Sequence, residues 1–455
     1  MNPLSVLNAE IIEEIFEYLT VKELLLSSLV SQSWYEFIAD SKKCMKKVKI
    51  KISIDRFLLD LSSVGIDCVK YSKRNYENLM MYQVFQSKLI NDSFEILSQP
   101  GRQWKWIQMQ EIDFPTRENF QTFMESAQNS VEVLHLEQFK FKDSDEMTSA
   151  LNYSCPKLKE LTLISCQFHN EIFINSNMLT SLNLISNYGL VKASIVAAFQ
   201  NLLSVNQHLK TLFLSGNIVT QIFCDDISDN IHFQLEDFKV TNYNSDKFHN
   251  RTDIEKNFNL FLKTQLKIEK IFLGEWMGAK VLETVFNDMK CLKDLTVMEL
   301  AKATPHVPIY RNGVEEPEVV NTNSFTLTPN PSIVKLDYQD IRGNIFVMKT
   351  LLEAAPNIRS LSTYSMNQEM LQMLADMISN LEYLSVSFFD ARNIIYNPIF
   401  PKLQDFASLR LDEILIHKIN LRKPEDRNHF EKVIFKCFID KYSSDGHKNT
   451  TPDET

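Results

Sequence analysis

At 455 residues, the chain is longer than the roughly 250 to 300 residues at which one compact core stops growing, so it is too long for one ordinary globular domain unless it is a repeat array or a barrel. Its net charge of −10 argues against broad binding to nucleic-acid backbones, which depends on clustered Lys and Arg. No stretch is apolar over the roughly 18 residues that a membrane span needs, so no membrane partner is expected.

Residues 1–20 contain no lysine or arginine, and four glutamates interrupt their apolar positions, unlike the basic start and continuous apolar core of a signal peptide. The seven cysteines form no C-x-x-C pair and fit free thiols better than a disulfide framework. Both features predict a cytoplasmic or nuclear protein.

The first predicted element is an amphipathic helix over residues 8–19. Its apolar residues recur at helical spacing: Ile11, Ile12, Ile15, Phe16 and Leu19. Thr20 and Glu23 match a capping box, so a second helix is predicted to begin there, and a third short segment carries Trp34 and Phe37. Three helices in about forty residues cannot enclose this much apolar surface alone. A partner or the following domain is expected to cover part of it.

Residues 7–34 resemble the F-box in order and spacing, from Leu7-Asn8-Ala9-Glu10-Ile11-Ile12 to Trp34. The resemblance implies that residues 1–45 bind a Skp-family adaptor and, through it, a cullin. Two positions depart from the family pattern: Asn8 replaces the usual Pro, and Ser31 replaces a frequent Cys. The alternative is an ordinary helical cap of a repeat array. The residues expected to face the adaptor are Leu7, Ile11, Ile15, Phe16, Leu19, Leu24, Leu25, Val30 and Trp34.

A dense basic run follows over residues 42–51, with six lysines interleaved with Val48, Ile50 and Ile52. This pattern favours the solvated side of an early strand or a helix end. The alternative is a localisation signal or a binding patch.

An L-x-x-L-x-L element then recurs about every 27 residues, within the range of a leucine-rich repeat. Three copies extend to the full signature that ends in Asn or Cys, at Cys166, Asn187 and Asn217. Weaker copies begin at Tyr76 and Trp104. The clear copies begin at Val131, Leu158, Leu179, Leu209, Leu235, Ile268, Leu292, Ile333, Ile358, Leu381 and Leu403.

Helical patterns between these elements predict an α/β fold, a solenoid or horseshoe with a parallel sheet on its concave side and helices on its convex side. A linker with weak early repeats is expected over 46–130, and the solenoid over 131–440. A proline-rich loop is predicted to interrupt it at 301–332, and 441–455 is predicted to be a disordered tail. A doubly wound α/β fold is disfavoured because no G-x-G-x-x-G follows a strand.

The chain contains no H-E-x-x-H, no His/Cys cluster at zinc spacing and no G-x-S-x-G, so we expect no enzyme activity, no cofactor and no metal. The resemblance implies a substrate-recognition subunit of an SCF-type cullin ubiquitin ligase, which directs proteins to ubiquitination and proteasomal degradation. The alternative is a non-catalytic repeat scaffold that acts outside a ubiquitin ligase.

Strand alternation predicts which side chains leave the sheet on its open face. Large apolar side chains at such positions mark a partner surface unless loops or the tail cover them. No outward position in the eleven strands is arginine, so recognition is expected to use shape and apolar contact more than a phosphorylated tag. The expected substrate-binding residues are Ile164, Ile185, Phe213, Phe272, Tyr364 and Tyr383.

Overall fold

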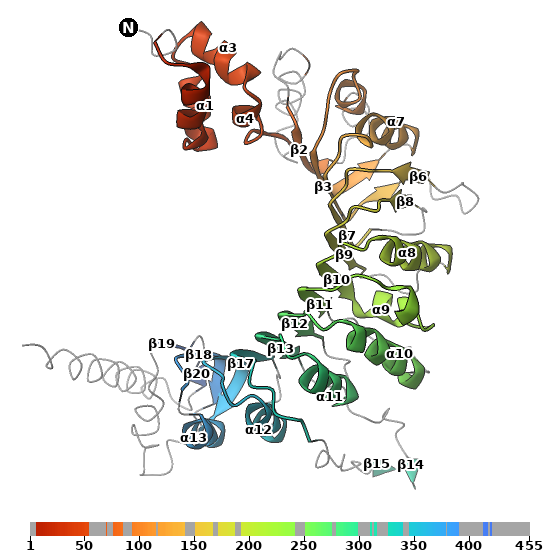
Figure 1. Cartoon of the computed structure of the whole chain (residues 1–455), viewed down its shortest axis with the longest axis vertical. Helices are drawn as coiled ribbons and strands as arrows, with labels where there is room; N and C mark the ends of the chain where they lie inside the picture. The colour runs from red at the N-terminus through yellow and green to blue at the C-terminus, as the bar shows by residue number, and fades with distance from the viewer. Residues whose placement is uncertain are drawn as a thin grey trace, which may run out of the picture. The chain divides into compact units, whose positions relative to one another are not determined.

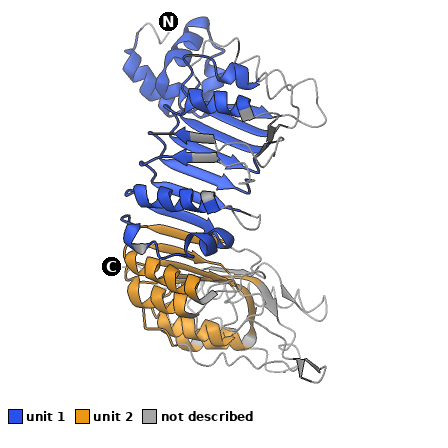
Figure 2. Ribbon diagram, turned by 90° about the vertical axis from the view of Figure 1, so that its right-hand side faces the viewer, with its two compact units in different colours: residues 1–233 blue, residues 234–455 orange. Residues whose placement is uncertain are grey.

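A computed structural model of the chain (Figure 1) divides into two compact units, residues 1–233 and 234–455 (Figure 2). The structure describes residues 6–53, 70, 76–84, 93–114, 117–141, 151–166, 172–186, 193–241, 251–274, 279–298, 310–311, 314–315, 326–339, 345–378, 380–390, 413–416 and 419–420.

Four helices open the first unit: α1 (Ala9–Glu17), α2 (Val21–Ser27), α3 (Gln32–Asp40) and α4 (Lys42–Met45). Each begins at a side chain that accepts a hydrogen bond from a backbone amide of the first turn. These N-caps are Asn8, Thr20, Ser31 and Ser41. The predicted capping box is confirmed, because Thr20 Oγ1 accepts from the Glu23 amide and Glu23 Oε2 accepts from the Thr20 amide. Short-range hydrogen bonds therefore fix where the helices start.

A parallel sheet follows in the first unit. Its strands, in spatial order, are β1 (Lys49–Ser53), β2 (Asn78–Val84), β3 (Trp106–Phe114), β4 (Val133–Glu137), β7 (Glu160–Ile164), β9 (Ser181–Ile185) and β10 (Thr211–Ser215). The helices α7 (Arg117–Ala127), α8 (Ala193–Val205) and α9 (Gly216–Ile222) lie to one side of these strands (Figure 1). Shorter elements complete the coils: β5 (Lys140–Phe141), β6 (Leu151–Ser154), β8 (Ile172–Asn175) and a 3-10 turn at Ser228–Asn230.

The early repeats are strands of this sheet. In the weak copies that begin at Tyr76 and Trp104, the side chains of Leu79, Met81, Ile107 and Met109 are fully buried. The strand β1 precedes both and pairs with β2 in parallel. The array therefore begins at residue 49, and the weak early repeats expected within 46–130 form β2 and β3 of the sheet.

The second unit repeats the same arrangement. Its parallel strands are β11 (Asp237–Thr241), β12 (Lys270–Leu273), β13 (Asp294–Met298), β16 (Lys335–Gln339), β17 (Ser360–Asn367), β18 (Tyr383–Asp390) and β19 (Glu413–Ile416). Its helices are α10 (Arg251–Thr264), α11 (Ala279–Asp288), α12 (Ile345–Ala354) and α13 (Gln368–Met377). The short strand β20 (Ile419–Asn420) pairs with β18, and β14 (Tyr310–Arg311) pairs with β15 (Val314–Glu315) in antiparallel.

Two predicted boundaries in the second unit are wrong. Ile414 of β19 lies opposite Leu384 of β18, so the strand that pairs with β18 lies further along the chain than a start at Leu403 predicts. The inserted loop ends before residue 332, because the buried Asn330 donates from Nδ2 to the Met289 carbonyl at 3.0 Å and belongs to the coil. The described part of the insertion includes β14 and β15, whereas 441–455 lies outside the described residues.

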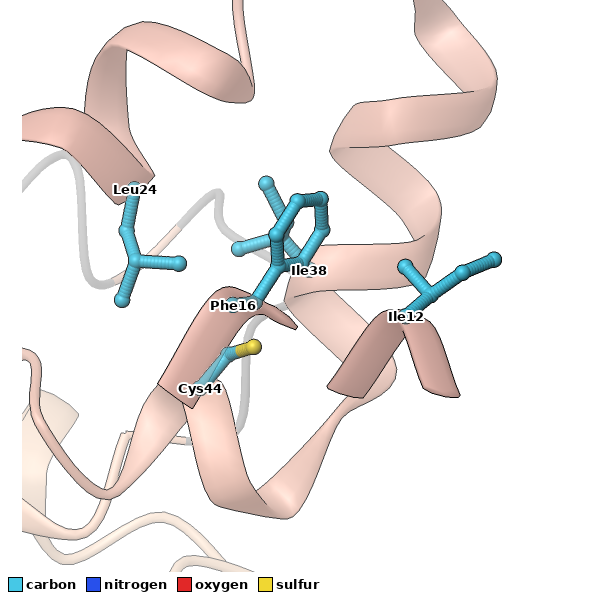
Figure 3. Close-up of a cluster of buried hydrophobic side chains, with 5 residues drawn as sticks. All are labelled: Ile12, Phe16, Leu24, Ile38 and Cys44. Atoms are coloured by element: carbon cyan, nitrogen blue, oxygen red, sulfur yellow. The ribbon is translucent and has the colours of Figure 1, made fainter. Parts of the chain in front are cut away.

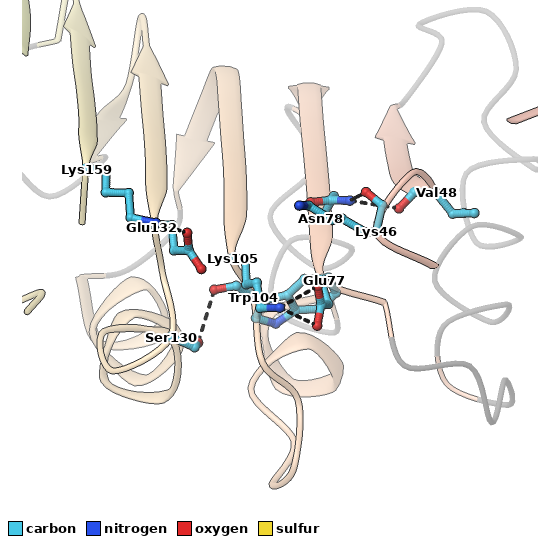
Figure 4. A network of polar contacts seen from close by, with 9 residues as sticks. All are labelled: Lys46, Val48, Glu77, Asn78, Trp104, Lys105, Ser130, Glu132 and Lys159. Atoms are coloured by element: carbon cyan, nitrogen blue, oxygen red, sulfur yellow. Dashed lines mark hydrogen bonds and ion pairs between the residues drawn. The ribbon is translucent and has the colours of Figure 1, made fainter. Parts of the chain in front are cut away.

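Polar side chains connect successive coils in the first unit. Where the strands begin, Lys105 pairs with Glu77 at 2.8 Å and Lys159 pairs with Glu132 at 2.7 Å (Figure 4). On the helical side, the buried Asn206 accepts from the Leu179 amide at 2.8 Å and donates to the carbonyls of Ser176 and Leu202, each at 2.7 Å. Buried Asn206 therefore satisfies backbone groups that a regular ladder leaves open.

The signature position Cys166 is buried and donates from Sγ to the Leu136 carbonyl at 3.4 Å. Asn217 is also buried, whereas Asn187 lies outside the described residues. Burial raises the pKa of both Cys166 and Cys155 to about 12.

Both thiols should therefore stay protonated at pH 8, where thiolate is the reactive form. We expect iodoacetamide to label the exposed Cys224 and Cys291 in native protein and to leave Cys155 and Cys166 unmodified. Peptide mass mapping measures this, with urea-unfolded protein as the control in which all four are labelled. Rapid native labelling of Cys166 would contradict the inward placement.

Candidate functional site

The N-terminal helices enclose a small core of their own (Figure 3). It is formed by Ile12, Phe16, Leu24, Ile38 and Cys44, each at most 4% exposed. The Phe16 ring lies 5.3 Å from that of Trp34 and 5.8 Å from that of Phe37 between ring centroids, the second in an edge-on contact. These are favourable aromatic geometries. The face of α1 that carries Ile12 and Phe16 therefore packs into this core.

Polar contacts fix α1 against the chain that leads to the sheet. Ser41, the N-cap of α4, donates from Oγ to Glu13 Oε1 at 2.7 Å. Lys47 donates from Nζ to the Leu19 carbonyl at 3.2 Å and also to the Glu17 carbonyl. A cation is favourable there because the carbonyl end of a helix carries partial negative charge. These contacts orient the outer face of α1.

That outer face is apolar and open to solvent. Ile11 and Ile15 are 48% and 47% exposed, and Leu25 of α2 is 42% exposed. Ten of the fifteen large hydrophobic side chains exposed among the described residues lie within residues 6–30. We call these ten the N-terminal apolar patch: Val6, Leu7, Ile11, Ile15, Tyr18, Val21, Leu25, Leu26, Leu29 and Val30. Such a concentration is typical of protein interaction surfaces.

The structure separates the nine residues expected to face an adaptor into three groups. Leu7, Ile11, Ile15, Leu25 and Val30 lie in the N-terminal apolar patch. Leu19 and Trp34 are partly buried and pack against the core.

Phe16 and Leu24 are interior residues, 2% and 0% exposed, so their expected place on the adaptor-facing surface is corrected. Phe16 lies on the one of two adjacent apolar stripes of α1 that the other helices cover, and Leu24 is the residue that α2 buries in the same core.

Five patch residues were absent from the expected set: Val6, Tyr18, Val21, Leu26 and Leu29. A second helical stripe in the sequence could have revealed Tyr18, because Leu7, Ile11, Ile15 and Tyr18 recur every three or four residues. Tyr18 is 90% exposed and Leu29 is 79% exposed. Both are therefore open to a partner.

Comparison with known proteins identifies these helices. The family model described as F-box domain matches residues 4–46. The chain contains an F-box domain joined to leucine-rich repeats. F-box domains typically bind Skp-type adaptors, and F-box proteins are generally adaptors rather than catalysts.

No curated protein matched the sequence. Among solved structures, the chain is similar to the protein chain in "Crystal structure of TLR13-ssRNA13 complex", with 12% identity and a TM-score of 0.36. The match covers 84% of this chain and 48% of that chain, so this chain spans less than half the length of that structure.

The two departures from the F-box pattern both lie at helix N-caps. Asn8 Oδ1 accepts from the Glu10 amide, and Ser31 Oγ accepts from the Trp34 amide, each at 3.3 Å. Asn and Ser are among the best residues at this position, and a proline or a cysteine offers no comparable oxygen. The substitutions therefore preserve the helix starts of the F-box.

The sheet-face residues expected to bind substrate do not form one apolar patch. In the first unit, Ile164 and Ile185 are register partners, and Phe213 lies opposite Asn183 in the neighbouring row. All three are half-buried rather than exposed. In this unit, the expected substrate-binding residues therefore form only a small apolar group on β7, β9 and β10.

The second unit carries the other three. Phe272 lies beneath the ammonium group of Lys239, with 4.6 Å from Nζ to the ring centroid. Tyr383 pairs in register with Ser360, whereas Tyr364 is four residues further along β17 and 39% exposed. Charged residues share this face: Asp237, Lys270, Asp294 and Lys335 are successive register partners. Desolvation raises the pKa of Asp237 and of Asp337.

Within the described ranges, no group of three or more His, Cys, Asp or Glu residues could hold a metal ion. Of the helices that the structure describes, none is both long and apolar enough to cross a membrane.

Proposed function

We propose that this protein is the substrate-recognition subunit of an SCF-type cullin ubiquitin ligase. The F-box binds a Skp-family adaptor, and the repeats hold a protein that is ubiquitinated and degraded. The observation that supports this most strongly is the N-terminal apolar patch on a domain that matches the F-box. Water-exposed apolar side chains at this density are costly unless a partner buries them.

The F-box has a core of its own beneath the patch, so the patch is not needed to hold these helices together. Its residues are available to a second protein. The repeats contribute no bond chemistry in this proposal. They raise the local concentration of substrate lysines near the ubiquitin-charged enzyme that other ligase subunits carry.

The second candidate is a repeat scaffold whose F-box binds no cullin complex. Co-purification separates the two functions. The full chain is expected to recover both the adaptor and the cullin from cell extract, and purified adaptor is expected to bind it directly. A scaffold outside the ligase would recover neither.

We predict that Ile11→Asp/Leu25→Asp abolishes recovery of the adaptor and cullin, because two carboxylates would be desolvated in the interface. The matched control is Val205→Asp/Leu266→Asp, which changes side chains 41% and 56% exposed outside the F-box. This control should bind as the wild type does. Circular dichroism melting checks that both variants fold.

Wild-type recovery of the adaptor by folded Ile11→Asp/Leu25→Asp protein would move the interface away from this patch. Loss of adaptor with both double variants would indicate a general effect of added charge rather than a specific surface.

A further inference from the structure

The basic run at residues 42–51 places two lysines above the first strands of the sheet. Lys49 and Lys51 point to the open face of β1, and both are exposed. The Lys49 ammonium lies 3.8 Å from the centroid of the Trp106 ring, and the Lys51 ammonium lies 4.5 Å from that of Tyr82. Lys49 pairs in register with Asn78, which pairs with Trp106, so its side chain extends across β2 to reach β3. Both cations are therefore held over the sheet.

Unlike several lysines at the sheet, Lys49 and Lys51 form no ion pair with an acidic residue in the described ranges. Lys105, Lys159 and Lys335 each form an ion pair at 2.7 to 2.8 Å. Within the described part of the chain, Lys49 and Lys51 form none. A cation above an aromatic face keeps N–H donors that can bind an anion. The aromatic rings therefore hold the two ammonium groups in place, and no ion pair within the described residues neutralises their positive charge.

Among the described residues, the register rows of Lys49 and Lys51 carry no carboxylate on β1, β2 or β3. Glu111 of β3 lies further along the strand, where its Oε2 accepts from Gln83 Nε2 at 3.2 Å. The outward positions of β1, β2 and β3 that flank the two lysines are filled by Ser53, Asn78, Met80, Tyr82, Trp106, Gln108 and Gln110. The nearest acidic residues on the same rows are Glu137 of β4 and Glu160 of β7. With strands about 4.8 Å apart, these lie roughly 14 and 19 Å across the sheet from β1. The cationic region is therefore confined to β1–β3.

We propose that the open face of β1, β2 and β3 binds an acidic, extended peptide segment of the substrate. Carboxylates of the segment pair with the Nζ atoms of Lys49 and Lys51, which lie over the rings of Trp106 and Tyr82. Aspartate and glutamate fit better than phosphate, because no arginine fork lies on these strands. The site rests on the proposed function, in which the repeats hold substrate.

Fluorescence anisotropy with the full chain tests this. The probe is a fluorescein-labelled peptide of sequence EELEELEE, and the comparison peptide is QQLQQLQQ. The wild type should bind the glutamate peptide at least about tenfold more tightly, with affinity that falls as salt rises. Lys49→Glu/Lys51→Glu should weaken binding of the glutamate peptide by at least about tenfold, because attraction becomes like-charge repulsion.

The matched control is Lys239→Glu/Lys270→Glu, which reverses two lysines on the sheet face of the second unit, one of them also above an aromatic ring. It should bind as the wild type does. Equal binding of both peptides, or equal loss in both double variants, would overturn the site. A peptide with phosphoserine at two of the glutamates that bound more than about tenfold tighter would overturn the carboxylate assignment.

Adaptor binding is measured on the same Lys49→Glu/Lys51→Glu protein, and it should be unchanged. Loss of peptide binding with retained adaptor confirms that the two surfaces are separate. A wild-type chain that binds the peptide but no adaptor would contradict the proposed function alone.

Discussion

Phe16→Ala is expected to unfold the F-box and to leave the second unit folded. The side chain is 2% exposed and contacts both Trp34 and Phe37, so its removal opens a cavity at the centre of the four helices. Truncating a buried Phe costs about 3 to 5 kcal/mol. A core of about forty residues has little stability beyond that amount. Adaptor binding should therefore be lost through unfolding.

Hydrogen exchange measures this directly. Amides of α1, α2 and α3 should lose protection, whereas those of β12 and β13 should retain it. Tyr18→Ala is the control, because Tyr18 is 90% exposed and its truncation should change stability by less than about 0.5 kcal/mol. Full protection of α1 in Phe16→Ala protein would mean that the core tolerates the cavity and that Phe16 is not central to it.

Asn206→Ala is the second change with a large expected effect. It leaves the Leu179 amide without an acceptor and two carbonyls, of Ser176 and Leu202, without a donor. All of these groups belong to buried residues. Each unsatisfied buried group costs about 1 to 3 kcal/mol, so the free energy of unfolding should fall by about 3 kcal/mol or more. The free energy that couples neighbouring coils should also fall, because the hydrogen bonds to Leu179 and Ser176 join one coil to the next.

Urea unfolding monitored by circular dichroism gives the midpoint and slope for this variant. Asn201→Ala is the matched control on the same helix, since Asn201 is exposed and its side chain makes no hydrogen bond within the described residues. Its midpoint should match the wild type or rise slightly, because alanine favours the helix. Equal midpoints for both variants would show that water can replace the Asn206 contacts.

Local rules made the element starts predictable from sequence. Helix caps act over three residues, so Thr20 and Glu23 could be recognised without a structure, and the structure confirms both hydrogen bonds. Strand alternation has a period of two, so the leucine pattern identifies the inward residues of most coils, including the weak copies at Tyr76 and Trp104. The strand that pairs with β18 was misplaced because several apolar runs near residue 403 compete, and only the pairing itself selects Glu413–Ile416.

The apolar spacing in the sequence is enough to show that α1 is apolar on a broad face and that the chain repeats a strand and a helix. It could not determine which stripe of α1 is internal, because Ile15 and Phe16 are both apolar and lie only about 100° apart around the helix. Packing of α2, α3 and α4 decided that Phe16 is core and Ile15 is surface. Likewise, only the parallel register brings Lys49 over Trp106, because that contact joins residues on strands separated by β2 and distant in the chain.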